Sequence, residues 1–99
     1  MVQYTTPTFI LTLPNTVDLS EAESIYFSIT QGKLEIVKTG ESVVLDGHTV
    51  SVYLSQEETG RFANTKANVQ LNWKYANGAR ACSNIVAVDV GTNLLKAVV

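Results

Sequence analysis

Hydrophobic and polar residues alternate most regularly between Lys66 and Tyr75. The apolar positions are Ala67, Val69, Leu71, Trp73 and Tyr75, and the polar positions are Lys66, Asn68, Gln70, Asn72 and Lys74. A period of two residues is typical of a β-strand with one buried face and one solvent-facing face. A second apolar stretch follows after a turn signal, so the segment from Lys66 to Val90 is predicted to form one long β-hairpin.

The turn of this hairpin is predicted at Asn77-Gly78, because a two-residue type I′ turn needs positive φ at both central positions. This loop sets a register in which the cross-strand pairs are Trp73 with Cys82, Leu71 with Asn84, Val69 with Val86, Ala67 with Val88 and Lys66 with Asp89. The last pair places opposite charges side by side, which favours this register.

A register with a one-residue bulge near Ser83 is the alternative. It would bring Ile85 inward but would also carry Asp89 into the core, where an unpaired carboxylate is costly. The unbulged register is therefore preferred. It leaves Ile85 on the outer face and makes Cys82 a small core residue opposite Trp73.

Shorter alternating stretches predict further strands, joined by turns that contain glycine. These strands are residues 8–13, with Phe9, Leu11 and Leu13 inward; 24–30, with Ile25, Phe27 and Ile29 on one face; 42–45; and 48–54. The predicted turns are Gln31-Gly32, which pairs Ile29 with Leu34, and Asp46-Gly47, which pairs Val43 with Val50. The connection from Asn15 to Glu23 is predicted to be a polar loop.

One short helical turn is predicted at residues 55–60. Ser55 and Glu58 have the spacing of a capping box, in which the hydroxyl caps a backbone N–H three residues on and the carboxylate reaches back. Gly60 is expected to end the helix as the residue after its C-cap. The segment is predicted to cross from one sheet to the other, with Phe62 closing the end of the core.

Together these elements predict an all-β fold, an antiparallel β-sandwich of about seven strands with one short helical crossover near residues 55–60. A small closed barrel is the structural alternative. The length of 99 residues indicates a single domain over residues 1–99. Residues 1–6 and 91–99 lie outside the predicted strands and are expected to be flexible or interface-forming tails.

Composition argues against several classes of function. The apolar content of 45% is ordinary for a globular chain, and the net charge of −2 comes with no basic stripe for a nucleic-acid backbone. No apolar run approaches the roughly 20 residues of a membrane span, and the start of the chain lacks the pattern of a secretory signal. The single cysteine excludes an internal disulfide. We therefore expect neither nucleic acid nor membrane as a partner.

Residues with catalytic or metal-binding potential are scattered along the chain. His48 is the only histidine and follows a turn, while Cys82 has no Cys or His at metal-ligand spacing. Asp18, Glu21 and Glu23 lack the spacing of a calcium loop. No pair of groups has an evident acid/base or nucleophilic role, so we expect no enzyme activity, no cofactor and no metal.

The candidate site is therefore a surface that meets a partner. The outer face of the long hairpin is flat and uncharged at its centre. The apolar residues near Val99 are expected to pack on the core or on a neighbouring subunit. The candidate interface residues are Asn68, Gln70, Asn72, Ile85 and Ala87 on that face, and Leu94 and Leu95 in the tail. The inner face of the hairpin, from Ala67 to Trp73 with Cys82, Val86 and Val88, is assigned wholly to the core.

Three segments carry a family resemblance. They are Asp18-Leu19-Ser20 with Ile25-Tyr26-Phe27-Ser28-Ile29; Leu54 to Thr59 followed by Phe62; and Val69 to Trp73 with Asn77-Gly78, Ser83 to Val86 and Val88. Together they resemble the small immunoglobulin-like domains encoded in phages and prophages of Gram-positive bacteria, such as the N-terminal domain of phage baseplate upper proteins. The likeness covers roughly residues 7–90 and consists of turns, alternation and one capped crossover.

This resemblance implies an immunoglobulin-like sandwich that serves as a non-catalytic virion, tail or baseplate-associated part. Its partners are then other virion or tail subunits, or further copies of itself, and no residue-level site comes with the family. The expected location is the virion, or the bacterial cytoplasm when the protein is expressed from a prophage. Baseplate upper proteins continue into further domains, whereas this chain stops at Val99, which favours a small tail or head accessory protein.

A carbohydrate- or surface-binding sandwich module is the alternative function. Such a module needs at least two exposed, coplanar aromatic rings beside a groove. The candidate rings are those of Tyr4, Tyr26, Tyr53 and Tyr75, whereas Trp73 is in phase with the buried residues of its strand.

Overall fold

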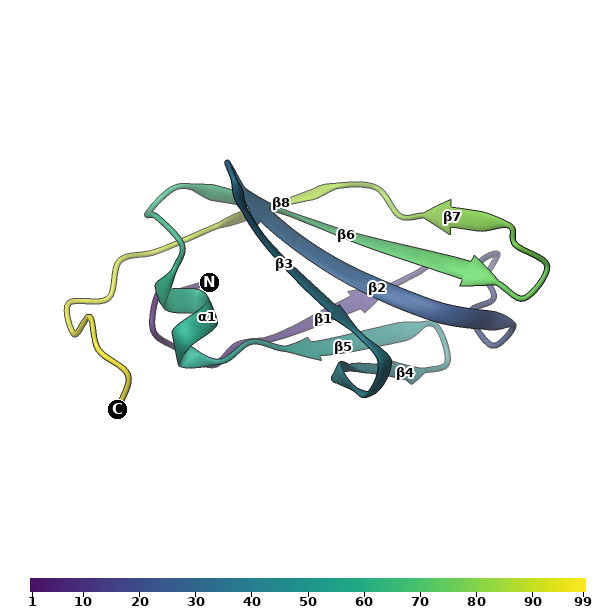
Figure 1. Cartoon of the computed structure of the whole chain (residues 1–99), viewed down its shortest axis with the longest axis horizontal. Coiled ribbons are helices and arrows are strands. Elements are labelled where there is room, and N and C mark those ends of the chain that lie inside the picture. The colour runs from purple at the N-terminus through teal and green to yellow at the C-terminus, as the bar shows by residue number, and fades with distance from the viewer.

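The computed structural model describes all 99 residues and consists almost entirely of β-strands (Figure 1). The elements are β1 (Thr8–Thr12), β2 (Ala22–Gln31), β3 (Leu34–Thr39), the 3-10 turn η1 (Gly40–Ser42), β4 (Val43–Asp46), β5 (Thr49–Tyr53), α1 (Gln56–Gly60), β6 (Lys66–Tyr75), β7 (Arg80–Cys82) and β8 (Val86–Asp89). There are eight strands rather than seven, because the second arm of the long hairpin is divided into β7 and β8. The helix α1 is too short to span a membrane.

The strands form two open antiparallel sheets, an arrangement consistent with the predicted sandwich. One sheet has three strands in the order β1-β5-β4, and the other has the order β3-β2-β6, with β7 and β8 both paired to the free edge of β6. Figure 1 shows the three-stranded sheet lying across one face of the larger sheet. As predicted, α1 connects one sheet to the other, since it follows β5 and precedes β6.

The core lies between the sheets and follows the predicted alternation. The inward residues of β6 are buried, as are Phe27 and Ile29 of β2 and Val50 and Val52 of β5. Phe62 is 1% exposed and closes one end of the core, as predicted. Leu19 is also buried, although the composition of its connection predicts a polar loop.

Two of the predicted turns are displaced by one residue. The two-residue loops are Gly32-Lys33 and Gly47-His48, with each glycine in the first central position at a φ of +57° and +60°, respectively. The resulting pairs are Ile29 with Ile36 and Val43 with Val52, two residues away from the predicted partners. Because side chains alternate with a period of two, this shift leaves every side chain on its predicted face.

The turn of the long hairpin has three residues rather than two. Tyr75 N donates to Ala79 O at 2.8 Å across the loop, and Gly78 has a φ of +90°. The register beside this loop therefore shifts by one residue, which reverses the two faces of the strand. Ala81 lies opposite Trp73, and Cys82 is exposed. The prediction that Cys82 is a core residue is wrong for this reason.

A bulge at residues 83–85 restores the predicted register. Three residues there oppose two on β6, so that Val69 pairs with Val86 and Lys66 pairs with Asp89. Ser83 anchors the bulge, because its N–H donates to Leu71 O at 2.9 Å and its Oγ accepts from Leu71 N at 3.0 Å. The prediction of an unbulged hairpin is thus wrong. The extra residue in the loop shifts the register by one, and the extra residue in the bulge shifts it back.

As a result of this compensation, Asp89 stays outside the core and pairs with Lys66. The Lys66 Nζ to Asp89 Oδ1 distance is 2.8 Å. The hydrogen bond from Lys66 and the attraction of its charge hold the pKa of Asp89 below its usual range. Both side chains are exposed, so this pair contributes little to stability and serves mainly as a marker of register.

The predicted capping box of α1 is present. Ser55 Oγ accepts from Glu58 N at 3.2 Å, and Glu58 Oε1 accepts from Ser55 N at 2.9 Å. Lys38 of β3 reaches the same carboxylate, with a distance of 2.7 Å from Nζ to Oε2. The short helix is therefore attached to the larger sheet by an ion pair whose side chains are only about a fifth exposed (21% and 19%).

Gly60 has a different role from the predicted one. The C-cap is Arg61, and Gly60 has no positive φ, so it does not end the helix in a left-handed conformation. Instead, a Cβ at Gly60 would overlap the ring of Tyr4. Tyr4 itself has a φ of +57°, and Thr59 Oγ1 donates to Thr5 O at 2.8 Å. Gly60 is thus required for close packing of the N-terminal segment on α1.

Replacing Gly60 with alanine is expected to destabilise the fold by about 1–3 kcal/mol, because overpacking outweighs the higher helix propensity of alanine. Urea denaturation measures this change. In a Tyr4→Ala background the same substitution is expected to be neutral or stabilising. A Gly60→Ala protein as stable as wild type would contradict the close packing.

The pH dependence of stability is expected to follow Glu58. Partial burial alone would raise the pKa of Glu58, but hydrogen bonds from Lys38 and Ser55 and the Lys38 charge lower it below its usual value. A carboxyl with a lowered folded-state pKa stabilises the fold above its unfolded pKa of about 4.3, and this contribution is lost as the pH falls. Between pH 6 and 3 the unfolding free energy of wild type should therefore decrease more than that of Glu58→Gln.

Glu57→Gln is the matched control for this titration, since Glu57 is exposed and makes no side-chain hydrogen bond. It should keep the wild-type dependence on pH. Parallel curves for wild type and Glu58→Gln would show that the capping carboxylate does not contribute in this way.

Candidate functional site

The residues with catalytic potential have structural roles. His48 Nδ1 lies 2.8 Å from Val17 O and links the β4–β5 turn to the loop before β2. Asp18 accepts hydrogen bonds from Ser20 Oγ and Ser20 N, at 2.6 and 2.9 Å, and these bonds lower its pKa. No group of three or more His, Cys, Asp or Glu side chains converges in a way that could hold a metal ion.

The exposed aromatic rings do not share a surface. Tyr26 is on the outer face of the five-stranded sheet, whereas Tyr53 is on the outer face of the three-stranded sheet. Trp73 is 4% exposed, as predicted, and its Nε1 donates to Tyr75 Oη at 3.0 Å. Tyr4 packs against Gly60. The paired aromatic platform that a sugar-binding module needs is therefore not formed by these four tyrosines.

The predicted outer-face residues lie together on β6 and β8. Asn68 pairs with Ala87 there, and Gln70 and Asn72 follow along β6. Two of the three amides are engaged within the domain, since Gln70 Nε2 donates to Ser83 O at 2.9 Å and Asn72 Oδ1 accepts from Arg80 at 3.0 Å. A role for this face as an interface stays a prediction.

The other candidate interface residues lie elsewhere. Ile85 belongs to the bulge and is 64% exposed, and Leu94 and Leu95 of the tail are 96% and 58% exposed. The tail leaves the domain beside α1, at the end opposite to β7 (Figure 1). The structure therefore does not bring the tail and the outer face of its own hairpin together.

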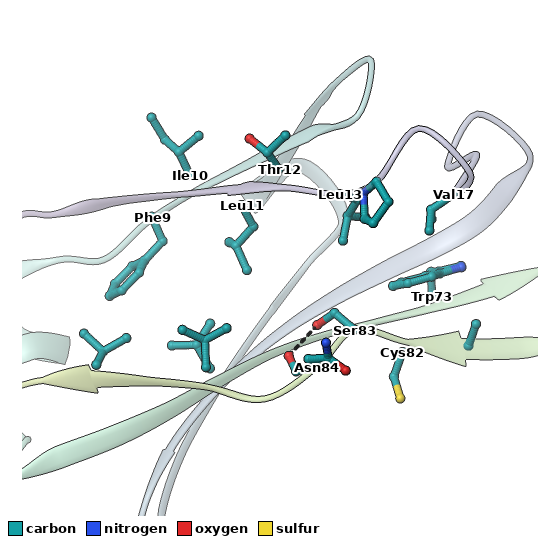
Figure 2. Close-up of a pocket in the computed structure, with 15 residues that line it drawn as sticks. Phe9, Ile10, Leu11, Thr12, Leu13, Val17, Trp73, Cys82, Ser83 and Asn84 are labelled. Atoms are coloured by element: carbon teal, nitrogen blue, oxygen red, sulfur yellow. Dashed lines mark hydrogen bonds between the residues drawn. The ribbon is translucent and has the colours of Figure 1, made fainter.

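An open apolar groove lies between β1 and the β7–β8 edge (Figure 2). Its volume is about 710 Å³, and eleven of the fifteen residues that line it are hydrophobic. Figure 2 shows Phe9 and Leu11 pointing from β1 toward the opposite edge, while Ile10 and Thr12 point away. Val86 and Val88 line the other wall, and Trp73 lies at one end. None of the fifteen side chains is charged.

The groove is open because its two walls belong to different sheets. β1 pairs only with β5, and β8 pairs only with β6, so neither strand has a partner on the side of the groove. Val86 is on the inner face of its strand, opposite Val69, and yet it is 53% exposed. The assignment of the inner face wholly to the core is therefore wrong at Val86.

The N-terminal residues lie beside the end of β8. Val2 forms a parallel bridge with Gly91, with Gln3 N donating to Gly91 O at 3.0 Å and Gly91 N donating to Met1 O at 2.7 Å. The terminal amino group also donates to Asp89 O at 2.8 Å. Beyond this short bridge, the space between β1 and β8 is not filled by any strand of the domain.

The accessible surface of the protein is consistent with such an opening. It is 6104 Å², whereas a folded chain of 10.8 kDa is expected to have about 5,500 Å². Alternation identified the inward residues Phe9 and Leu11, but no local signal shows that the strands carrying them lack a neighbour.

Comparison with protein-family models, with curated proteins and with solved structures finds no match to this chain.

Cys82 offers a chemical test of the register along the groove, since it is the only cysteine and is exposed. Its thiol is expected to react with Ellman's reagent in the native protein without denaturant. The matched variant Cys82→Ala/Ala81→Cys places the thiol opposite Trp73 on the inner face, where it should react more slowly. The opposite order of rates would indicate the unbulged register.

Proposed function

We propose that this chain is a non-catalytic structural module of immunoglobulin-like fold, which acts through protein–protein contacts in a phage or prophage particle. The observation that carries the proposal is the open groove between β1 and β8. Contiguous exposed apolar surface marks interaction sites in soluble proteins. Unpaired strand edges beside such a surface can accept an added strand from a partner.

The pairing order supports the immunoglobulin-like assignment. In that fold one sheet has the order A-B-E-D and the other G-F-C, to which variable-type domains add C′. The order β1-β5-β4 matches B-E-D, and β3-β2-β6-β8 matches C′-C-F-G, with the chain visiting the strands in the same sequence. The position without a counterpart is strand A, which lies beside strand B and therefore beside β1.

Some hallmarks of antibody domains are absent. The only cysteine is Cys82, so no disulfide joins the sheets, and the only tryptophan is Trp73 on β6 rather than on β2. Many domains share the sandwich architecture without these features. The missing disulfide and the position of Trp73 therefore argue against an antibody-type domain. They do not argue against an immunoglobulin-like order of strands.

The particle role rests on the resemblance over residues 7–90 to phage and prophage domains. Partners are then other virion or tail subunits or further copies of the chain, and the location is the virion, or the cytoplasm of a bacterium that expresses a prophage. Terminase, portal or tail genes are expected beside its gene. Sugar-utilisation genes in that position would instead favour a carbohydrate-binding module, for which Tyr26 and Tyr53 offer no shared platform.

Blocking the groove is expected to weaken association. Val86→Lys places a charge on the groove wall at a side chain that is already 53% exposed, so the monomer should still fold. Because a buried unpaired charge is costly, self-association measured by sedimentation velocity should weaken by roughly tenfold or more.

Val44→Lys is the control, since Val44 is 59% exposed on the outer face of the other sheet. It should associate like wild type. Equal association of the two variants would contradict the groove as the surface for self-association. A wild-type protein that remains monomeric at the highest soluble concentration would count heavily against the proposed function.

A further inference from the structure

We infer that the groove is a strand-accepting site and that its occupant is the segment Leu94–Val99 of a second copy of this chain. The inference rests on the proposed function, because it names the partner of the same groove. It follows from three observations: the chemistry and length of the groove, the apolar face of the tail, and the direction of the tail away from the groove of its own molecule.

The groove sets strict requirements on its occupant. Its walls are mainly apolar and carry no charged side chain, so the buried face of the occupant must be mainly apolar and without charge. The free edges of β1 and β8 present unpaired backbone groups, which an extended chain satisfies by main-chain hydrogen bonds. The five residues of β1 span about 17 Å, which is the length of one short strand.

The tail meets each of these requirements. In an extended conformation, Leu95, Ala97 and Val99 share one face, and that face has no charge. Lys96, the only charged side chain after Asp89, falls on the opposite face and stays in solvent. The six residues of the segment span about 20 Å, enough to cover the roughly 17 Å of β1.

The apolar side chains of the tail are also not buried against its own domain. On the face that would enter the groove, Leu95 is 58% exposed and Val99 is 85% exposed. Large exposed apolar side chains gathered in one short segment are uncommon in a protein that remains alone. Groove and tail are thus complementary surfaces carried by the same chain.

The tail cannot readily fill the groove of its own molecule. Hydrogen bonds between Gly91 and the N-terminal residues hold its root, and these residues occupy the space beside the end of β8. The tail is directed away from the groove, and Val99 ends near α1, where Gln56 bonds to its backbone at 2.9 and 3.0 Å (Figure 1). A second copy is therefore the source of the strand, and such a head-to-tail contact builds a closed ring or an open filament.

Two tail substitutions test this inference in the full-length chain. Leu95→Asp places a carboxylate on the face that enters the groove and should weaken self-association by roughly tenfold or more. Leu94→Asp is the matched control, because it adds the same charge to the opposite face of the same segment and should associate like wild type. Both side chains are exposed, so circular dichroism and thermal unfolding should be unchanged.

A mixing experiment distinguishes the occupant from the site. Val86→Lys has a blocked groove and an intact tail, whereas Leu95→Asp has an intact groove and an altered tail. At a concentration at which wild type associates and each variant alone is monomeric, their mixture should give one-to-one dimers and nothing larger. No complex in the mixture would overturn the head-to-tail contact.

The proposed function can survive the failure of this inference. If Val86→Lys dissociates the protein while Leu95→Asp assembles like wild type, the groove is still the interface, and its occupant is not the tail. If Val86→Lys associates like wild type, the groove is not the interface between copies of the chain. The inference is then wrong, and the proposed function loses the observation that carries it.

Discussion

The ladder between β2 and β6 is the interaction on which the rest of the structure depends. Both strands have ten residues, and their register places Phe27 opposite Leu71 and Ile29 opposite Val69, all of them buried. Burial of each such side chain contributes about 1.5–3 kcal/mol, and cross-strand pairs are the units that stabilise a sheet. The remaining strands of the larger sheet extend this ladder, and the three-stranded sheet covers its inner face.

The groove follows from the unequal sizes of the two sheets. Three strands cannot cover the inner face of a sheet whose second edge includes β7 and β8, so Phe9 and Leu11 face Val86 across an open space. The bulge at residues 83–85 interrupts the edge on one side, a feature that limits uncontrolled strand pairing. β1 has no such interruption, which makes it the more receptive wall for a strand from a partner.

Much of the fold could be predicted because its signals are local. Alternation identified the inward residues of β1, β2 and β6, and the Ser55–Glu58 spacing identified the capping box. Turn residues were less reliable, since a glycine fits more than one position of a loop. Two turns differed by one residue without consequence, whereas the three-residue loop after Tyr75 reversed Ala81 and Cys82. The bulge that compensates for this loop is held by two hydrogen bonds between Ser83 and Leu71, which are distant in sequence.

By itself, the sequence determined which segments form strands, which face of most strands is apolar and where the helix begins, because these depend on periods of two and on spacings of a few residues. The exception is β7, whose faces depend on the length of the loop before it. Only the tertiary structure decided which strands are neighbours and which edges remain free. Those choices rest on contacts between residues far apart in the chain, such as Phe9 with Phe27, whose rings lie 5.6 Å apart. For this reason Val86 has the pattern of a core residue and yet lines an open groove.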